Sequence, residues 1–181
     1  MSDQNLPTSG TWVIDPAHTS IEFVARHLMV TKVRGRFTDF SGTIEIADEP
    51  TESRVEIEVN LASVYTATPD RDNHLKSADF FDVENHPTMK FVSTSIVEKG
   101  DGYSMTGDLT VRGVTHPLTL DVEYLGVMTD PYGNDKAAFS ASGEVTRADW
   151  GLTWNAPLEA GGMLVSKTAQ IEIEAQAARP E

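Results

Sequence analysis

The amino-acid sequence predicts an all-β protein whose seven or eight strands form one antiparallel sandwich or barrel. Three observations support this prediction. Apolar and polar residues alternate with a period of two through most of the 181 residues. Turn-forming residues separate the alternating runs at short intervals. No mid-chain linker divides the chain, so a single domain is expected.

The alternation is strict in three runs, Val55–Leu61, Leu118–Tyr124 and Ala169–Ala175. A period of two places every apolar side chain of a strand on one face of the sheet. Looser alternation predicts further strands at Thr11–Ile14, Thr19–His27, Lys32–Ile46, Thr88–Val97, Tyr103–Val111 and Ala137–Arg147. Within the long run from residue 32 to 46, Gly35 and Gly42 suit a bend or a bulge.

Three turns and one helical segment interrupt the strands. The turns are predicted at Asp48–Thr51, Glu98–Gly102 and Asp130–Asn134. The residues from 69 to 82 do not alternate and are expected to form a short helix or two, beginning at Pro69 with acidic residues in the first turn. Leu75, Phe80 and Phe81 are expected to cap one end of the sheet structure. Residues 1–10 and 178–181 are assigned as tails around a domain at 11–177.

Charge and composition limit the function. The formal net charge of -14 disfavours nucleic acid and anionic membrane surfaces as partners. The absence of cysteine excludes disulfides, thiolate nucleophiles and cysteine-based metal sites. No signal peptide or membrane-spanning run is present in the sequence, which predicts a cytoplasmic protein that is not an integral membrane protein.

The residue patterns that mark common catalytic sites are missing. The histidines lack the close spacing of metal ligands, and neither a Gly-x-Ser-x-Gly elbow nor a phosphate-binding glycine loop occurs. The sequence therefore predicts no metal and no cofactor, although a catalytic pair among its many carboxylates stays open. The five histidines are His18, His27, His74, His86 and His116.

Small residues at expected inward positions favour a cavity. An eight-stranded barrel is just wide enough to be filled by side chains or to hold one small ligand. The scattered aromatic residues fit either a filled core or a ligand-lined pocket. Small inward side chains would leave apolar volume unfilled, which is typical of a ligand cavity. These residues are Ala25, Ser63, Ser93, Gly107, Ala141, Gly143 and Ala169.

Several ordered motifs together resemble one family. They are Trp12-x-Ile14-Asp15-x-x-His18-x-x-Ile21-x-Phe23, Gly35-x-Phe37-x-x-Phe40-x-Gly42, Arg71-Asp72-x-His74-Leu75, Phe80-Phe81-Asp82-Val83, Pro87-x-x-x-Phe91-x-Ser93, Gly107-x-Leu109-Thr110-x-Arg112-Gly113 and Arg147-x-Asp149-Trp150-Gly151-Leu152. In this order and spacing, from about residue 12 to 175, the chain resembles the YceI-like family of lipocalin-like polyisoprenoid-binding proteins.

The resemblance implies an antiparallel eight-stranded lipocalin-like barrel whose interior holds a long isoprenoid lipid, and often a homodimer. It also implies that a polar cluster of His18, Arg71, Asp72 and His74 comes together near the pocket mouth. The sequence departs from the family pattern in two places. It carries no secretory leader, and Val165-Ser166-Lys167 replaces a Gly/Asp-rich turn before the last strand.

The first functional hypothesis is a carrier or sequestering protein for an isoprenoid or quinone-like amphiphile. We expect its pocket to be lined by Phe23, Phe37, Phe40, Phe81, Met89 and Phe91. A second hypothesis is an enzyme acting on such a lipid, with His18, Asp72 and His74 as acid–base candidates. A third is a structural or stress-response module whose barrel is filled by its own side chains.

Overall fold

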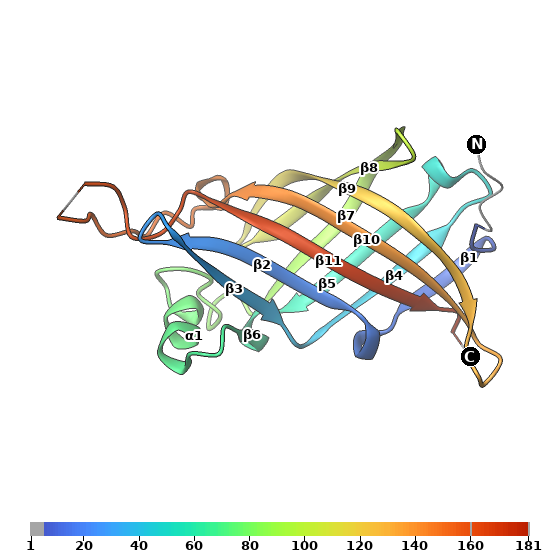
Figure 1. Cartoon of the computed structure of the whole chain (residues 1–181), viewed down its shortest axis with the longest axis horizontal. Helices are drawn as coiled ribbons and strands as arrows, with labels where there is room; N and C mark the ends of the chain where they lie inside the picture. Colours follow the sequence, from blue (N-terminus) through green and yellow to red (C-terminus); the bar gives the residue numbers. More distant parts are fainter. Residues whose placement is uncertain (1–5, 160, 181) are drawn as a thin grey trace.

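A computed structural model describes residues 6–159 and 161–180, which form an elongated antiparallel barrel (Figure 1). Of the two expected tails, residues 1–5 and 181 lie outside the described residues. The strands are β1 (Gly10–Ile14), β2 (Ser20–His27), β3 (Thr31–Phe37), β4 (Phe40–Ile46), β5 (Arg54–Asn60), β6 (Val64–Tyr65), β7 (Thr88–Lys99), β8 (Gly102–Val111), β9 (Val114–Thr129), β10 (Asp135–Thr146) and β11 (Thr168–Ala178). The helix α1 spans Pro69–Lys76, and 3₁₀ turns span Pro16–His18, Pro50–Glu52, Leu61–Ser63 and Arg147–Trp150.

Eight strands close the barrel in the order β1-β4-β5-β7-β8-β9-β10-β11. The ring closes where β1 pairs with β11, with Val13 opposite Ala178 and Ile14 opposite Ala177. Beyond that junction β2 takes the place of β1 alongside β11, and β3 and β6 follow it. Closure leaves few unpaired strand edges, and it confirms the predicted eight-stranded antiparallel barrel.

The run predicted as one strand over residues 32–46 is two strands, because the chain changes neighbours at Thr38 and Asp39. Before the break β3 pairs with β2 and β6, and after it β4 pairs with β1 and β5. The break is held by Thr38, whose amide donates to the carbonyl of Ser63 at 3.3 Å, and by Asp39, whose carbonyl accepts from the amide of Asn60 at 3.0 Å. The interruption therefore lies away from both glycines.

The glycines instead give room to aromatic rings. A Cβ atom at Gly35 would lie 2.2 Å from Cζ of Phe23, which is its cross-strand partner. A Cβ atom at Gly107 would lie 2.4 Å from Cζ of Phe91 on the neighbouring strand. The pairing of β2 with β3 runs without a register shift through Gly35, so no bulge forms there. Each glycine thus lets a ring lie flat against the strand.

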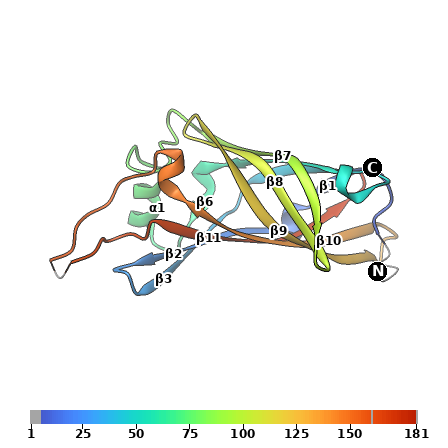
Figure 2. The same cartoon turned by 90° about the horizontal axis from the view of Figure 1, so that it is seen from above.

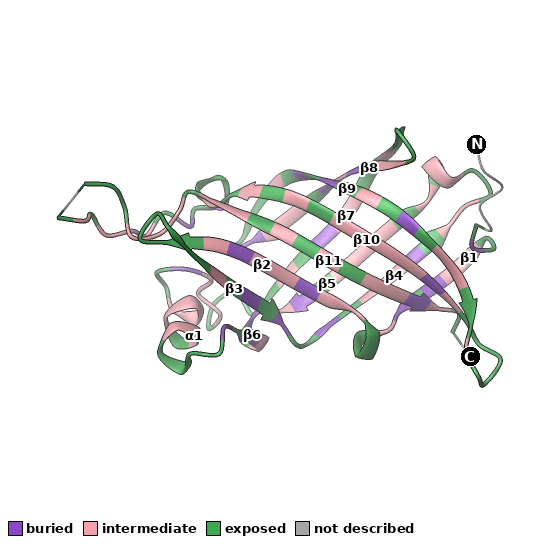
Figure 3. Cartoon of the chain, viewed as in Figure 1, coloured by how far each residue is buried: buried purple, intermediate pink, exposed green. Residues whose placement is uncertain are grey.

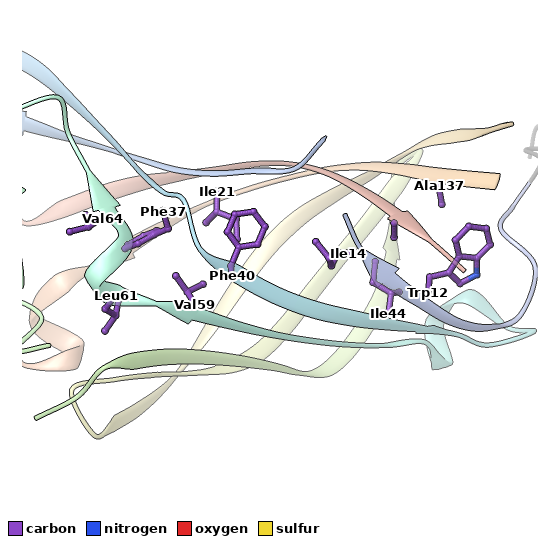
Figure 4. Close-up of a cluster of buried hydrophobic side chains, with 11 residues drawn as sticks. Trp12, Ile14, Ile21, Phe37, Phe40, Ile44, Val59, Leu61, Val64 and Ala137 are labelled. Atoms are coloured by element: carbon purple, nitrogen blue, oxygen red, sulfur yellow. The ribbon is translucent and has the colours of Figure 1, made fainter. Parts of the chain in front are cut away.

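Burial alternates along the strands, as the period of two predicts (Figure 3). The largest buried cluster runs along the barrel from Val64 and Leu61 at one end to Trp12 and Ala137 at the other (Figure 4). Two smaller clusters centre on Trp150 and on Leu120. The core therefore lines the barrel wall from end to end.

The helix is shorter than expected, because α1 ends at Lys76 and residues 77–82 form turns. The amide of Ser77 donates to the carbonyl of His74 at 3.1 Å, and the amide of Phe81 reaches back to the carbonyl of Leu75 at 2.9 Å. These bonds fold the chain under the helix, so that Phe80 and Phe81 face the barrel end. Figure 2 shows α1 and the β2–β3 hairpin at the same end of the molecule.

Candidate functional site

The barrel encloses a cavity of about 440 Å³. Its wall consists of side chains at alternate positions of the strands, such as Val55, Ile57 and Val59 of β5 and Ile171 and Ile173 of β11. Among its described lining, three side chains carry a charge at neutral pH, those of Glu22, Asp48 and Arg147, and two tyrosines, Tyr103 and Tyr124, add hydroxyl groups. Such a cavity offers dispersion contacts and few hydrogen-bonding partners to an occupant.

The cavity extends nearly the length of the barrel. At one end its lining includes Leu75 of α1 and the adjacent Phe80 and Phe81. At the other end it includes Leu6 and Pro7, just before β1. Residues 6–9 therefore lie against the barrel, where the carbonyl of Thr8 accepts a hydrogen bond from the indole of Trp12 at 2.9 Å.

Five of the six apolar residues predicted to line the pocket do so. Phe23, Phe37, Phe81, Met89 and Phe91 all lie on the cavity wall. The rings of Phe23 and Phe37 are 5.7 Å apart, and those of Phe37 and Phe81 are 5.9 Å apart, so three of the residues form one aromatic surface. The sixth, Phe40, is buried in the main core cluster and is not among the lining residues that the structure describes.

The small residues divide into two groups. Ala25, Ala141 and Ala169 line the cavity, as expected. Gly107 and Gly143 leave no free volume, because the ring of Phe91 and the side chain of Leu120 cover them. Ser63 and Ser93 bind backbone atoms instead: Ser93 Oγ accepts from the amide of residue 55 at 2.8 Å, and Ser63 Oγ donates to the carbonyl of residue 60 at 2.6 Å.

The predicted polar cluster does not form as a unit. Arg71 and Asp72 meet at Thr66, which is only 4% exposed. Asp72 Oδ1 accepts from the Thr66 amide at 2.7 Å and hydroxyl at 2.5 Å, while Arg71 donates to Thr66 Oγ1 at 2.8 Å and to its carbonyl at 2.6 Å. This network fixes the start of α1 to β6. Its donors and acceptors are therefore satisfied within the segment.

The two histidines have other partners. Nδ1 of His18 lies 2.8 Å from Oδ2 of Asp15, and Nε2 of His74 lies 2.9 Å from Oδ2 of Asp79. The His74 ring packs edge-on against Phe80, at 5.0 Å. Residues 16–18 and α1 lie apart along the barrel (Figures 1 and 2). The family resemblance implied that these residues meet, whereas the sequence itself shows only that each lies outside a predicted strand.

Asp15 carries the hydrogen bonds at the junction of β1 and β2. Its Oδ1 accepts from the amide of Ala17 at 3.0 Å, and Nζ of Lys136 lies 3.5 Å from its Oδ2. The hydrogen bond with His18 lowers the pKa of Asp15 most, against an opposing effect of burial. The Asp15 carboxylate thus stabilises the turn, and within the described residues it is not part of the cavity lining.

Arg147 is one of the charged cavity residues that the sequence did not assign to the pocket, although it begins the Arg147-x-Asp149-Trp150-Gly151-Leu152 motif. Its Nε donates to the carbonyl of Ser166 at 2.8 Å, and its Nη1 donates to the carbonyls of Leu152 and Trp154 at 2.7 and 2.8 Å. Burial lowers the pKa of Arg147, yet a guanidinium stays protonated in proteins. It anchors the connection to β11 at the α1 end of the cavity.

The described residues contain no group of three or more His, Asp or Glu side chains placed to hold a metal ion. Within the same part of the chain, no helix has the length and apolar character needed to cross a membrane.

Comparison with known proteins assigns the family. A model of the YceI-like domain matches residues 12–177. The chain belongs to the YceI-like family. A UPF0312 protein of Serratia proteamaculans is 40% identical over 137 residues, which are 75% of this chain and 71% of that protein.

Solved structures agree with the assignment. The YCEI protein of Campylobacter jejuni is 31% identical and superposes with a TM-score of 0.73, covering 86% of this chain and 90% of its own. A polyisoprenoid-binding domain from Saccharophagus degradans superposes with a TM-score of 0.68 over 96% of this chain and all of its own. That domain is 15% identical, so the likeness shows that it shares the YceI-like fold.

Proposed function

We propose that this YceI-like protein binds one long isoprenoid lipid or quinone-like amphiphile in its barrel, as a carrier or sequestering protein. The observation that supports the proposal is a continuous, almost wholly apolar cavity that runs from Leu6 to Phe81. Its volume of about 440 Å³ lies within the range of small-molecule sites, roughly 300–1,000 Å³.

The chemistry of the wall selects the class of ligand. A polar or charged chain would lose its hydration inside the barrel and find few partners, which costs roughly 1–3 kcal/mol for each unpaired polar group. An apolar chain gains about 25 cal/mol for each Å² removed from water. The cavity shape therefore favours a long hydrocarbon chain, and the polyisoprenoid-binding domain of the same fold supports an isoprenoid.

Uptake by lipid-free protein tests the proposal. We expect the protein to take up a polyprenol and a long-chain quinone and to release both unchanged. The variant Ala141→Phe places a ring in the cavity and should lower uptake at least tenfold, whereas Ser142→Phe, on the neighbouring exposed position, should bind like the wild type.

Three outcomes separate the hypotheses. Uptake without chemical change supports a carrier. Turnover of the added lipid would favour an enzyme, and its loss in His18→Ala or His74→Ala would point to those side chains. Absence of uptake in the wild type would favour a barrel that acts without cargo. The expected homodimer stays a prediction, to be measured by analytical ultracentrifugation.

A further inference from the structure

The β2–β3 hairpin ends in an exposed apolar tip. Leu28, Met29 and Val30 are 47%, 56% and 74% exposed. Met163 is 44% exposed and lies in the connection that joins the 3₁₀ turn at Arg147–Trp150 to β11. The amide of Leu28 donates to the carbonyl of Leu164 at 2.9 Å, so the hairpin and the connection project together. Both lie at the α1 end of the molecule (Figures 1 and 2). We call Leu28, Met29, Val30 and Met163 the hairpin tip.

The turn at this tip is built from residues that its backbone disfavours. Leu28 and Met29 have φ values of 55° and 64°, and the amide of Val30 donates to the carbonyl of His27 at 3.2 Å. These are the features of a type I′ turn, which favours Asn-Gly because both central residues need positive φ. Large apolar residues there are unfavourable for the fold and are exposed as well, which indicates a role outside folding.

The strands beside the tip carry positive charge in an acidic protein. Between Phe23 and Thr38 the sequence contains no Asp or Glu, and its basic residues are Arg26, Lys32, Arg34 and Arg36. Arg26 lies opposite Lys32 in the strand pairing, next to the tip. Arg34 is paired with Glu172 at 3.2 Å, Glu144 lies in the same surface groove as Arg26, Lys32 and Arg34, and the connection adds the exposed Glu159 and Lys167. A net positive charge remains beside the tip.

We propose that the hairpin tip docks reversibly on the surface of an anionic lipid bilayer. Apolar side chains flanked by Lys and Arg are the combination that binds the interface of such a bilayer. The hairpin tip also adjoins the cavity. Ala25 and Val165 line the cavity wall, and Val165 pairs with His27, the residue that precedes the tip. Docking would thus bring one end of the cavity to the membrane, where a long-chain lipid can enter or leave.

The charge of the whole molecule opposes this docking only weakly at physiological salt. The net charge of -14 predicts repulsion from an anionic surface, but charges farther than a Debye length of about 8 Å are largely screened at physiological salt. The positive charges beside the tip are the ones that approach the lipid. The same charges disfavour a second copy as the occupant, because a symmetric contact would bring two basic hairpins together.

Co-sedimentation with vesicles tests the proposal. We expect the full chain to bind vesicles of phosphatidylglycerol mixed with phosphatidylcholine, and to bind phosphatidylcholine alone at least tenfold more weakly. The double variant Leu28→Asn, Met29→Gly suits the type I′ turn better. It should therefore keep or raise the melting temperature while losing at least tenfold in vesicle affinity. Lys32→Gln should lower that affinity about fivefold.

A matched control lies at the other end of the molecule. Met128 is 75% exposed; its cross-strand partner is Lys136, and Asp130 of the adjoining turn and Asp135 at the start of β10 lie close to it in the chain. Met128→Ser should leave vesicle binding unchanged. Ala141→Phe should also still dock, so that docking and cargo binding can fail separately.

The proposal is overturned if the wild type does not bind anionic vesicles, or if the Asn-Gly variant binds them as well as the wild type. It is also overturned if that variant converts a dimer into a monomer while vesicle binding is absent in both proteins. That result would assign the hairpin tip to a contact between copies.

Discussion

Gly35 and Gly107 allow two phenylalanine rings to lie against the barrel wall. A Cβ atom at Gly35 would lie closest to Cζ of Phe23, at 2.2 Å, so the ring leaves no room for a side chain at this position. From the sequence, Gly35 is expected to allow a bend and Gly107 to leave unfilled volume in the cavity. The sequence pattern does not reveal the pairing register, which decides which side chain of the neighbouring strand lies over a glycine.

Gly35→Ala should lower the free energy of unfolding by about 1–3 kcal/mol, because the new methyl group forces the Phe23 ring out of place. The cost should be smaller in a Phe23→Leu background, since a smaller side chain leaves room for the methyl. Urea unfolding of the four proteins measures both values. Equal costs in the two backgrounds would contradict the proposed contact.

Asp15 should make the stability depend on pH. Because its folded pKa is lowered, Asp15 stabilises the protein above its ordinary value of 3.8, and the contribution is lost as the pH falls through the folded pKa. Asp15→Ala should therefore cost about 1 kcal/mol at pH 7 and progressively less in acid. Thermal melts of the wild type and Asp15→Ala from pH 7 into the acidic range measure this loss of stability, with Asp108→Ala as an exposed control. A cost that grows in acid would contradict the assignment.

Most strands could be predicted at the scale of single elements, because alternation is a local property of the sequence. The strands at residues 54–60 and 102–111 begin and end within one residue of their predicted limits. The division of β3 from β4 could not be predicted, because it reflects a change of neighbours across the barrel. The helix ended early because residues 77–82 bond back to it, which is also a tertiary feature.

The start of α1 should behave as one energetic unit. Thr66→Val and Asp72→Asn are expected to couple by about 0.5–3 kcal/mol, because each removes a partner of the same buried hydrogen bonds. His18→Ala and Asp72→Asn should instead be additive within about 0.5 kcal/mol. Denaturant unfolding of all the variants in both double-mutant cycles measures the two coupling energies. Strong coupling between His18 and Asp72 would restore the cluster that the family resemblance implied.

At the scale of the whole molecule, the sequence indicated an apolar cavity but not its outline. Period-two alternation identifies which side chains face inward, so Phe23, Phe37 and Phe91 could be placed on the wall. It does not distinguish inward residues that fill the core, such as Phe40, from those that line the space. That distinction, and the position of Arg147 at one end, depend on how the closed barrel packs.

The mass of the folded protein as purified, measured by native mass spectrometry, tests the proposed cargo most directly. We predict one bound amphiphile per chain, whose tandem mass spectrum shows an isoprenoid or quinone-like chain. The bound mass should be absent from Ala141→Phe and present in Ser142→Phe. A wild type with the mass of the bare polypeptide that also fails to take up polyprenol or quinone would contradict the proposal, as would a bound mass retained by Ala141→Phe.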